Sequence, residues 1–325
     1  MIRNISRLTV CVLCLALATA ACASAAQVTL PAVSAPFTTE PGPEAYVRPA
    51  PPVLDKFDPA SVSGIEIGDY PVIPEVNPAM RTIYQAGLTR GNDPRVFSKL
   101  GDCMTETPYF LAPFGAGAYD LGEYGYLAEV IAQFHGHPAR GEGWEQDSFE
   151  TIGLAPASGF NIAGPLDPTW ANPEWCQASE SPLACEYRVA RPSLAVIMFG
   201  TNDVVYTDAA IYDFYLRTVV IETLDRDIVP ILSTFPARLE DVEKSRLLNR
   251  IVIRVAADYG VPLMNLNRAL EPLPNYGVDP ADPIRLSTPP DKRVDRFTGP
   301  NLQAGFTVRN LVTLQTLDAV WRAVR

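Results

Sequence analysis

The sequence predicts an α/β fold in which a central parallel sheet carries helices on both faces. Two observations support this prediction. Apolar runs of strand length alternate with runs of helical spacing through the second half of the 325-residue chain, and this order is typical of parallel sheets. Gly, Asn and Asp follow directly after the apolar runs, as they do where such sheets bind ligands at their carboxyl edge.

The expected elements can be placed from their ends. Pro192 and Gly200 bound a continuous apolar strand, and Gly260 is expected to cap the longest helix. Between 109 and 191 the pattern loosens and Gly, Pro and Trp become frequent, so we expect a loop-rich insertion with a substrate-facing surface. We expect strands over 96–100, 195–199, 228–235 and 261–266, and helices over 211–224, 239–259 and 308–324.

The N-terminal part is expected to lie outside the globular domain. Arg3 and Arg7 precede an apolar run at 8–18, and small residues at 21–26 then offer Ala-x-Ala cleavage sites, the pattern of an export signal. The apolar run is too short to span a membrane well, and no later run reaches that length. We expect a signal peptide at 1–26, a Pro-rich spacer at 27–60 and one domain at 61–325 of a secreted or cell-surface protein.

The charge of the chain limits its partners. The sequence holds 26 Lys and Arg against 37 Asp and Glu, a formal net charge of −11. Such an excess of acids disfavours nucleic acid and anionic lipid surfaces, which bind basic patches. We expect no nucleic-acid partner and no transmembrane segment in the mature chain.

Three of the six cysteines lie in or at the export signal, and small residues before Cys22 also permit a lipid anchor there. Cys176 and Cys185 are close enough in sequence to form a local disulfide in an oxidising compartment. Cys103 is then the odd thiol, although its pairing with either of the other two is an alternative.

Three blocks follow strand-like runs and could meet at one sheet edge. They are Gly101-Asp102-Cys103, Met198-Phe-Gly-Thr-Asn-Asp203 and Ser233-Thr-Phe-Pro236. In this order they resemble the SGNH/GDSL hydrolase family, in which a Ser from Gly-Asp-Ser, a Gly, the Asn of Gly-x-Asn-Asp and a C-terminal Asp-x-x-His build an esterase site. The resemblance covers about residues 93 to 325 and implies a flavodoxin-like three-layer sandwich.

The resemblance implies a role for each matching residue. Cys103 stands at the nucleophile, and Asn202 would donate a side-chain N–H to an oxyanion hole, beside the backbone N–H of Cys103. Gly159 is our choice for the family's glycine, with Gly153 and Gly164 as alternatives. Ester hydrolysis is the activity that these roles imply.

The last block departs from the family pattern. The segment 277–287 looks like the family's C-terminal block, with Asp282 at the acid and Arg285 at the histidine, and no histidine follows His137. A guanidinium cannot be deprotonated in a protein, so Arg285 cannot act as a general base. It could instead lower the pKa of the Cys103 thiol at close range. Losing one member of a catalytic triad typically costs on the order of 10⁴–10⁶ in rate.

These observations leave three functions open. The first is a degenerate, catalytically impaired relative of the family that binds a carbohydrate or acyl ligand. In it, Asp282 and Arg285 form either an ordinary ion pair or a pair that recognises a ligand carboxylate or sugar hydroxyl, since Arg offers a planar fork of donors. The second is an active esterase that uses Cys103 with an unidentified base, such as His135, His137 or a carboxylate. The third is a structural or assembly protein at the cell surface.

Two other groups of residues have competing interpretations. His135 and His137 lack nearby Cys or carboxylate partners in sequence, so we expect a surface loop, no metal and no cofactor. Phe160, Trp170 and Trp175 could stack on sugar rings or pack within loops.

Overall fold

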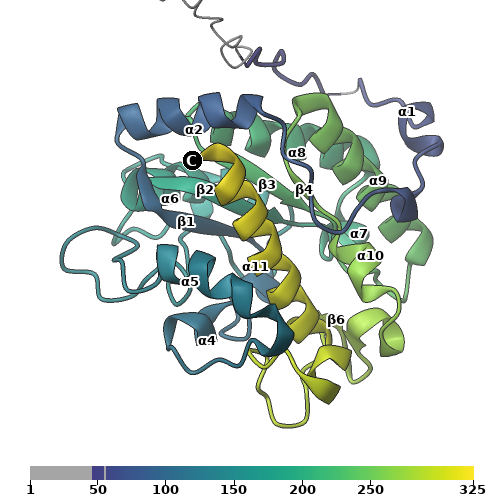
Figure 1. Cartoon of the computed structure of the whole chain (residues 1–325). Coiled ribbons are helices and arrows are strands. Elements are labelled where there is room, and N and C mark those ends of the chain that lie inside the picture. Colours follow the sequence, from purple (N-terminus) through teal and green to yellow (C-terminus); the bar gives the residue numbers. More distant parts are fainter. Residues whose placement is uncertain (1–45, 55) are drawn as a thin grey trace, which may run out of the picture. The chain divides into compact units, whose positions relative to one another are not determined.

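A four-stranded parallel sheet forms the centre of the chain in the computed structural model, which describes residues 46–54 and 56–325 (Figure 1). The strand order is β1-β2-β3-β4, and each neighbouring pair is parallel. The predicted α/β class is therefore confirmed. The strands are β1 (Asp93–Gly101), β2 (Pro192–Met198), β3 (Val229–Ser233) and β4 (Leu263–Met264).

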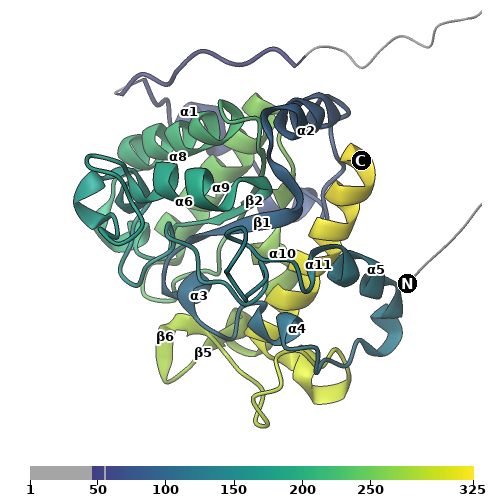
Figure 2. The ribbon, with the colours of Figure 1, turned by 90° about the vertical axis from the view of Figure 1, so that its left-hand side faces the viewer.

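Helices cover both faces of this sheet, which gives the three layers that were predicted. Helices α6, α8 and α9 lie on one face, and α2, α5 and α11 lie on the other (Figure 2). Short helices and turns lie mostly in the connections between these layers. The helices are α1 (Ala60–Ser63), α2 (Ala79–Arg90), α3 (Cys103–Glu106), α4 (Ala112–Gly115), α5 (Ala128–Phe134), α6 (Pro182–Ala190), α7 (Asp203–Tyr206), α8 (Ala209–Leu224), α9 (Val242–Tyr259), α10 (Leu266–Leu270) and α11 (Gly305–Val324).

The observed helix starts differ from the predicted ones by a few residues, because capping side chains determine where each helix begins. Asp208 accepts from the backbone N–H of Ile211, so α8 begins before the predicted start at 211. Asp241 accepts from the N–H of Lys244, and α9 begins after it rather than at 239. The predicted cap at Gly260 is confirmed, because this residue has a left-handed φ of 60° and ends α9.

The loop-rich insertion covers the outer edge of β1, which would otherwise expose unpaired backbone groups. The backbone N–H of Phe97 donates to Ser148 Oγ at 3.0 Å, and the N–H of Ala157 donates to the carbonyl of Gly101 at 3.3 Å. The second contact brings the 157–160 segment beside the carboxyl end of β1.

Part of the stretch expected as a spacer makes contacts with the domain. Arg48 pairs with Asp225 at 2.5 Å and with Asp227 at 2.6 Å, and Tyr46 donates to the carbonyl of Tyr259. The predicted export signal and Cys22 lie outside the described residues. Among the residues that are described, no helix combines the length and the apolar composition needed to cross a membrane.

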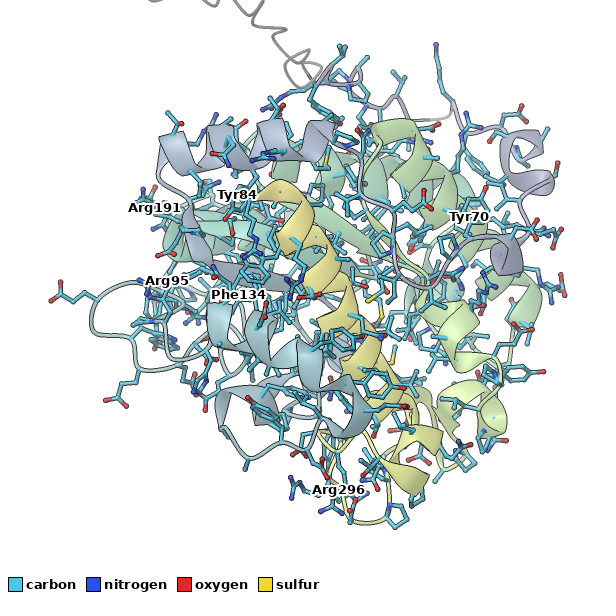
Figure 3. All side chains as sticks on the ribbon, in the orientation of Figure 1. Tyr70, Tyr84, Arg95, Phe134, Arg191 and Arg296 are labelled. Atoms are coloured by element: carbon cyan, nitrogen blue, oxygen red, sulfur yellow. A yellow bond between two sulfur atoms is a disulfide. The ribbon has the colours of Figure 1, made fainter. Side chains whose placement is uncertain are left out.

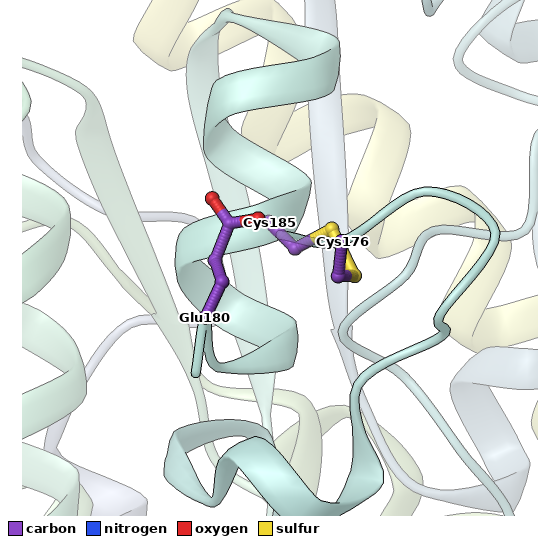
Figure 4. Close-up of side chains that lie close together, drawn as sticks. All are labelled: Cys176, Glu180 and Cys185. Atoms are coloured by element: carbon purple, nitrogen blue, oxygen red, sulfur yellow. A yellow bond between two sulfur atoms is a disulfide. The ribbon is translucent and has the colours of Figure 1, made fainter. Parts of the chain in front are cut away.

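A disulfide joins Cys176 to Cys185, as predicted, and Cys103 is a free, buried thiol (Figure 4). Glu180 lies close to the two sulfur atoms, and these three residues form the one group of three potential metal ligands in the described part of the chain. Both thiols are bonded to each other, and Glu180 pairs with Arg188 at 2.7 Å. This group is therefore a structural cross-link at the start of α6.

Candidate functional site

The turn from β1 into α3 presents Cys103 at the carboxyl edge of the sheet. Asp102 caps the four-residue α3 by accepting from the N–H of Met104 at 3.0 Å. Gly101 allows this tight turn, because a Cβ there would lie 2.2 Å from Thr105 Oγ1 and 2.6 Å from the carbonyl oxygen of Met198. The sequence block thus folds as a strand, a sharp turn and a helix start, and Cys103 is the first residue of that helix.

The Cys103 thiol is poorly placed to ionise. Its side chain is 6% exposed, and burial raises the pKa of the thiol from 9.0 to about 11. Asp102 adds to the increase in this pKa, whereas the positive charge of Arg285 opposes it. The expected thiolate-stabilising effect of Arg285 is present in direction, but burial outweighs it.

Asp282 and Arg285 lie on a hairpin beside α3 rather than on the central sheet. The hairpin pairs β5 (Val278–Asp279) with β6 (Asp282–Leu286), and β6 contacts α3. Arg285 Nε lies 3.1 Å from a carboxylate oxygen of Asp282, and both side chains are partly exposed. Their charges act on the pKa of Cys103 with opposite signs. The structure thus places the hairpin that carries Asp282 and Arg285 beside the helix that begins at Cys103.

Asn202 and the 157–160 segment also meet at this edge. Asn202 Nδ2 donates to the carbonyl of Phe160 at 2.8 Å, which leaves one of its two amide N–H groups outside this bond. Gly159 precedes Phe160 and has a φ of +86°. Apart from its two chain neighbours, no residue that the structure describes lies within 4 Å of the position that its Cβ would take. The two alternatives are enclosed: Gly153 lies against Glu186 and the Lys99 carbonyl, and Gly164 lies against the Phe160 ring.

Two buried carboxyl groups lie beneath the site. Asp102 and Asp203 are fully buried, and burial raises the pKa of each to about 6. Asp203 accepts from the N–H of Ile162 and from Thr207 Oγ1, each at 3.0 Å, so it fixes the insertion against α7. One oxygen of each carboxyl group lacks a hydrogen-bond partner within the described residues.

Two arginines belong to the site although sequence reasoning did not single them out. Arg238, in the loop after β3, donates from a terminal nitrogen to the carbonyl of Thr201 at 3.3 Å, next to Asn202. Arg309 on α11 is fully buried, stacks on the Phe110 ring at 3.6 Å, and donates to the Met104 carbonyl and to Thr105 Oγ1. The acceptors of both arginines are distant in sequence, so no local sequence pattern indicates that Arg238 and Arg309 belong to the site.

Neither histidine lies at this edge. His137 Nε2 lies 2.7 Å from Asp93, the first residue of β1. Nine extended residues separate the two ends of that strand by about 26 Å, so His137 is far from Cys103. His135 lies after α5, with Nδ1 3.1 Å from the buried Asp147.

The three aromatic residues singled out from the sequence separate into two places. Trp170 is 64% exposed and meets the Phe160 ring edge-on at a centroid distance of 6.0 Å, next to Asn202. Trp175 instead packs against Trp144 and the guanidinium of Arg140. Tyr206, the last residue of α7, is also exposed, and its backbone N–H donates to the carbonyl of Asn202.

Several solved structures are similar to this chain at low sequence identity. No family model and no curated protein matches the chain. A lipase/acylhydrolase from Enterococcus faecalis is similar at 18% identity, over 70% of this chain and 96% of its own, with a TM-score of 0.44. The acetylxylan esterase Axe2 from Geobacillus stearothermophilus is similar at 16% identity, over 68% and 93%, with a TM-score of 0.42. A GDSL-like lipase from Bacteroides thetaiotaomicron is similar at 12% identity, over 74% and 98%, with a TM-score of 0.39.

Proposed function

We propose that this chain is a secreted, catalytically impaired relative of the SGNH/GDSL hydrolases that binds a carbohydrate or acyl ligand at the carboxyl edge of its sheet. The observation that carries the proposal is the state of Cys103 and Arg285. The pKa of this thiol is raised to about 11, the β5–β6 hairpin that carries Arg285 contacts the helix that begins at Cys103, and a guanidinium cannot accept a proton.

The chemistry of ester cleavage explains why this pair impairs catalysis. The nucleophile must lose a proton when it attacks, and the leaving alkoxide must gain one. A base near pH 7 performs both transfers in the family, and Arg285 can perform neither. The positions of both histidines, paired with Asp93 and Asp147, argue against their use as a substitute base.

Two exposed aromatic residues, on segments joined to Asn202, support retained binding, and they favour the carbohydrate alternative. Trp170 and Tyr206 are 64% and 74% exposed, and they belong to two segments joined through Asn202–Phe160 and Asp203–Ile162 hydrogen bonds. Exposed aromatic rings near a site of polar donors offer a flat apolar face to a ligand. A sugar ring has matching apolar faces and hydroxyl edges.

A pair of variants tests the binding half of the proposal. Saccharide binding, followed by tryptophan fluorescence or calorimetry, should weaken by about fivefold or more in Trp170→Ala, because loss of an aromatic anchor from a binding site costs on the order of 1 kcal/mol or more. Trp175→Ala is the matched control, since that ring packs on Arg140 and Trp144. Equal loss in both variants, or no loss in Trp170→Ala, would contradict binding at Trp170.

The turnover half of the proposal is tested with short acyl esters. We expect the purified mature protein to cleave p-nitrophenyl acetate no faster than its Cys103→Ala variant. Faster cleavage that depends on Cys103 would favour the active esterase instead.

Export, with lipid attachment at Cys22 as an alternative to free secretion, is part of the proposal and rests on the sequence of residues 1–26. Mass measurement of the mature protein after expression with its own N-terminus would distinguish cleavage after a small residue from a lipid-bearing Cys22.

A further inference from the structure

Arg238 and Arg285, the two arginines that approach the site from the loop after β3 and from the β5–β6 hairpin, make few and long contacts, whereas some arginines elsewhere are held tightly by carboxylates. Arg217, for example, holds Asp213 through Nε at 2.9 Å and Asp258 through a terminal nitrogen at 2.8 Å. Arg293 similarly contacts both carboxylate oxygens of Asp295, at 2.6 to 3.1 Å. These guanidiniums are committed to carboxylates of the protein itself.

Most hydrogen-bond donors of Arg285 have no acceptor within the described part of the chain. Its ionic contact is the single approach of Nε to Asp282 at 3.1 Å. Within residues 46–54 and 56–325, its two terminal nitrogens donate no hydrogen bond. The side chain is 43% exposed, so these donors can be reached from solvent.

Arg238 also makes few hydrogen bonds, although its side chain is more buried than that of Arg285. One terminal nitrogen donates to the Thr201 carbonyl at 3.3 Å, and Nε lies 3.4 Å from Glu240. Nε is buried and makes no hydrogen bond of good geometry within the described residues, and the side chain is 17% exposed. Because Nε is closed to solvent, the donors of Arg238 that remain for a ligand are those of its two terminal nitrogens.

Both arginines belong to the same edge. Arg238 reaches Thr201, the residue before Asn202, and Arg285 is close enough to Cys103 for its charge to act on the thiol. Cys103 and Asn202 follow β1 and β2, whose ends are adjacent, with Gly101 paired to Met198. The two guanidiniums therefore approach the site from the β3 loop and from the β5–β6 hairpin.

On this basis, and resting on the proposed function, we propose that the ligand of this site is an acidic saccharide whose carboxylate is held by Arg238 and Arg285. A guanidinium offers five N–H donors in a planar fork that matches the two oxygens of a carboxylate. Arg309 adds a third positive charge beneath the site, whereas Asp282 and Glu240 each offset one charge.

The net charge of −11 means that long-range attraction does not bring an anion to this chain. Recognition must come from direct contacts, and a single substitution at either arginine should therefore weaken it. This makes the inference testable one residue at a time.

The experiment compares two ligands of the same length, tetragalacturonate and its methyl ester, by calorimetry on the full mature chain. The acid should bind about tenfold or more tightly than the ester, because hydrogen bonds between charged groups exceed neutral ones by this much. Arg238→Gln and Arg285→Gln should each weaken binding of the acid by about tenfold while leaving the ester within about twofold.

Arg95→Gln is the matched control, because it removes the same charge from the amino half of β1, away from the hairpin (Figures 1 and 3). It should leave both affinities unchanged. Arg238→Lys keeps the charge without the fork, and thermal unfolding of each variant shows whether it is folded.

The outcomes separate this inference from the function on which it rests. Equal binding of acid and ester, with no effect of either arginine variant, would overturn the acidic ligand and leave saccharide binding intact. A preference for the acid that survives both variants would also overturn it. Binding of neither ligand would count against both the inference and saccharide binding.

Discussion

The reactivity of Cys103 gives a prediction whose magnitude follows directly from the site. Burial raises the pKa of this thiol from 9.0 to about 11, which is two units. Below pH 9 the thiolate fraction, and with it the rate of alkylation, should therefore be about 100-fold lower than for an ordinary cysteine. At pH 8 about one molecule in a thousand would carry the thiolate.

Two substitutions test which charges set the pKa of Cys103, because they should shift this pKa in opposite directions. Arg285 lowers the pKa of Cys103, so Arg285→Gln should raise it further and slow labelling. Asp282 raises the same pKa, so Asp282→Asn should lower it and speed labelling. The two residues form an ion pair at 3.1 Å, which makes each variant the matched control for the other.

The assay is iodoacetamide labelling followed by intact mass over pH 7 to 11. Limited access to a side chain that is 6% exposed lowers the rate at every pH, whereas ionisation sets the midpoint of the pH profile. The two effects are thus distinguishable. A midpoint at or below 9, or faster labelling of Arg285→Gln than of the unmodified chain, would refute this account of the site.

Three further predictions concern stability, each measured by urea unfolding. Burial raises the pKa of Asp203 to about 6, so the stability contributed by its protonated form is complete below pH 4 and is lost as pH rises through 6. Asp203→Asn should therefore gain about 2–3 kcal/mol relative to the unmodified chain between pH 4 and pH 7.5, and an equal difference at both pH values would contradict this. Replacing Cys176 and Cys185 together by Ser should cost about 2–3 kcal/mol, because the disulfide closes a short loop, and an unchanged urea midpoint would count against it. Gly101→Ala should cost about 1–3 kcal/mol, since its Cβ would overlap Thr105 and the Met198 carbonyl. Gly64→Ala is the control, because no described residue beyond its chain neighbours lies within 4 Å of the added Cβ, and equal costs would refute the packing argument.

Several features of the fold could be predicted because they are encoded locally. The apolar run of β2 lies in a strand whose seven residues are all buried, so its sequence had to be continuously apolar. Gly260 marks the end of α9 because a left-handed residue is needed there. The Cys176–Cys185 disulfide follows from short spacing along the chain.

The candidate site could be predicted only in part, because its remaining features depend on contacts between distant segments. The sequence placed Cys103 after a strand, but its burial beneath the β5–β6 hairpin sets its pKa and cannot be read locally. Arg238 joins the site through a backbone carbonyl, an acceptor that every residue carries. The sequence alone gives Trp170 and Trp175 the same two interpretations. Their roles differ because Trp175 packs on Arg140 and Trp170 does not.

Ester turnover in a rescue experiment tests the central claim most directly. The claim is that this site does not hydrolyse esters because it lacks a general base, and not because its scaffold is unsuitable. Cleavage of p-nitrophenyl acetate should be equal for the unmodified chain and for Cys103→Ala, and it should rise in the double variant Cys103→Ser with Arg285→His. Turnover by the unmodified chain that Cys103→Ala abolishes would contradict the claim.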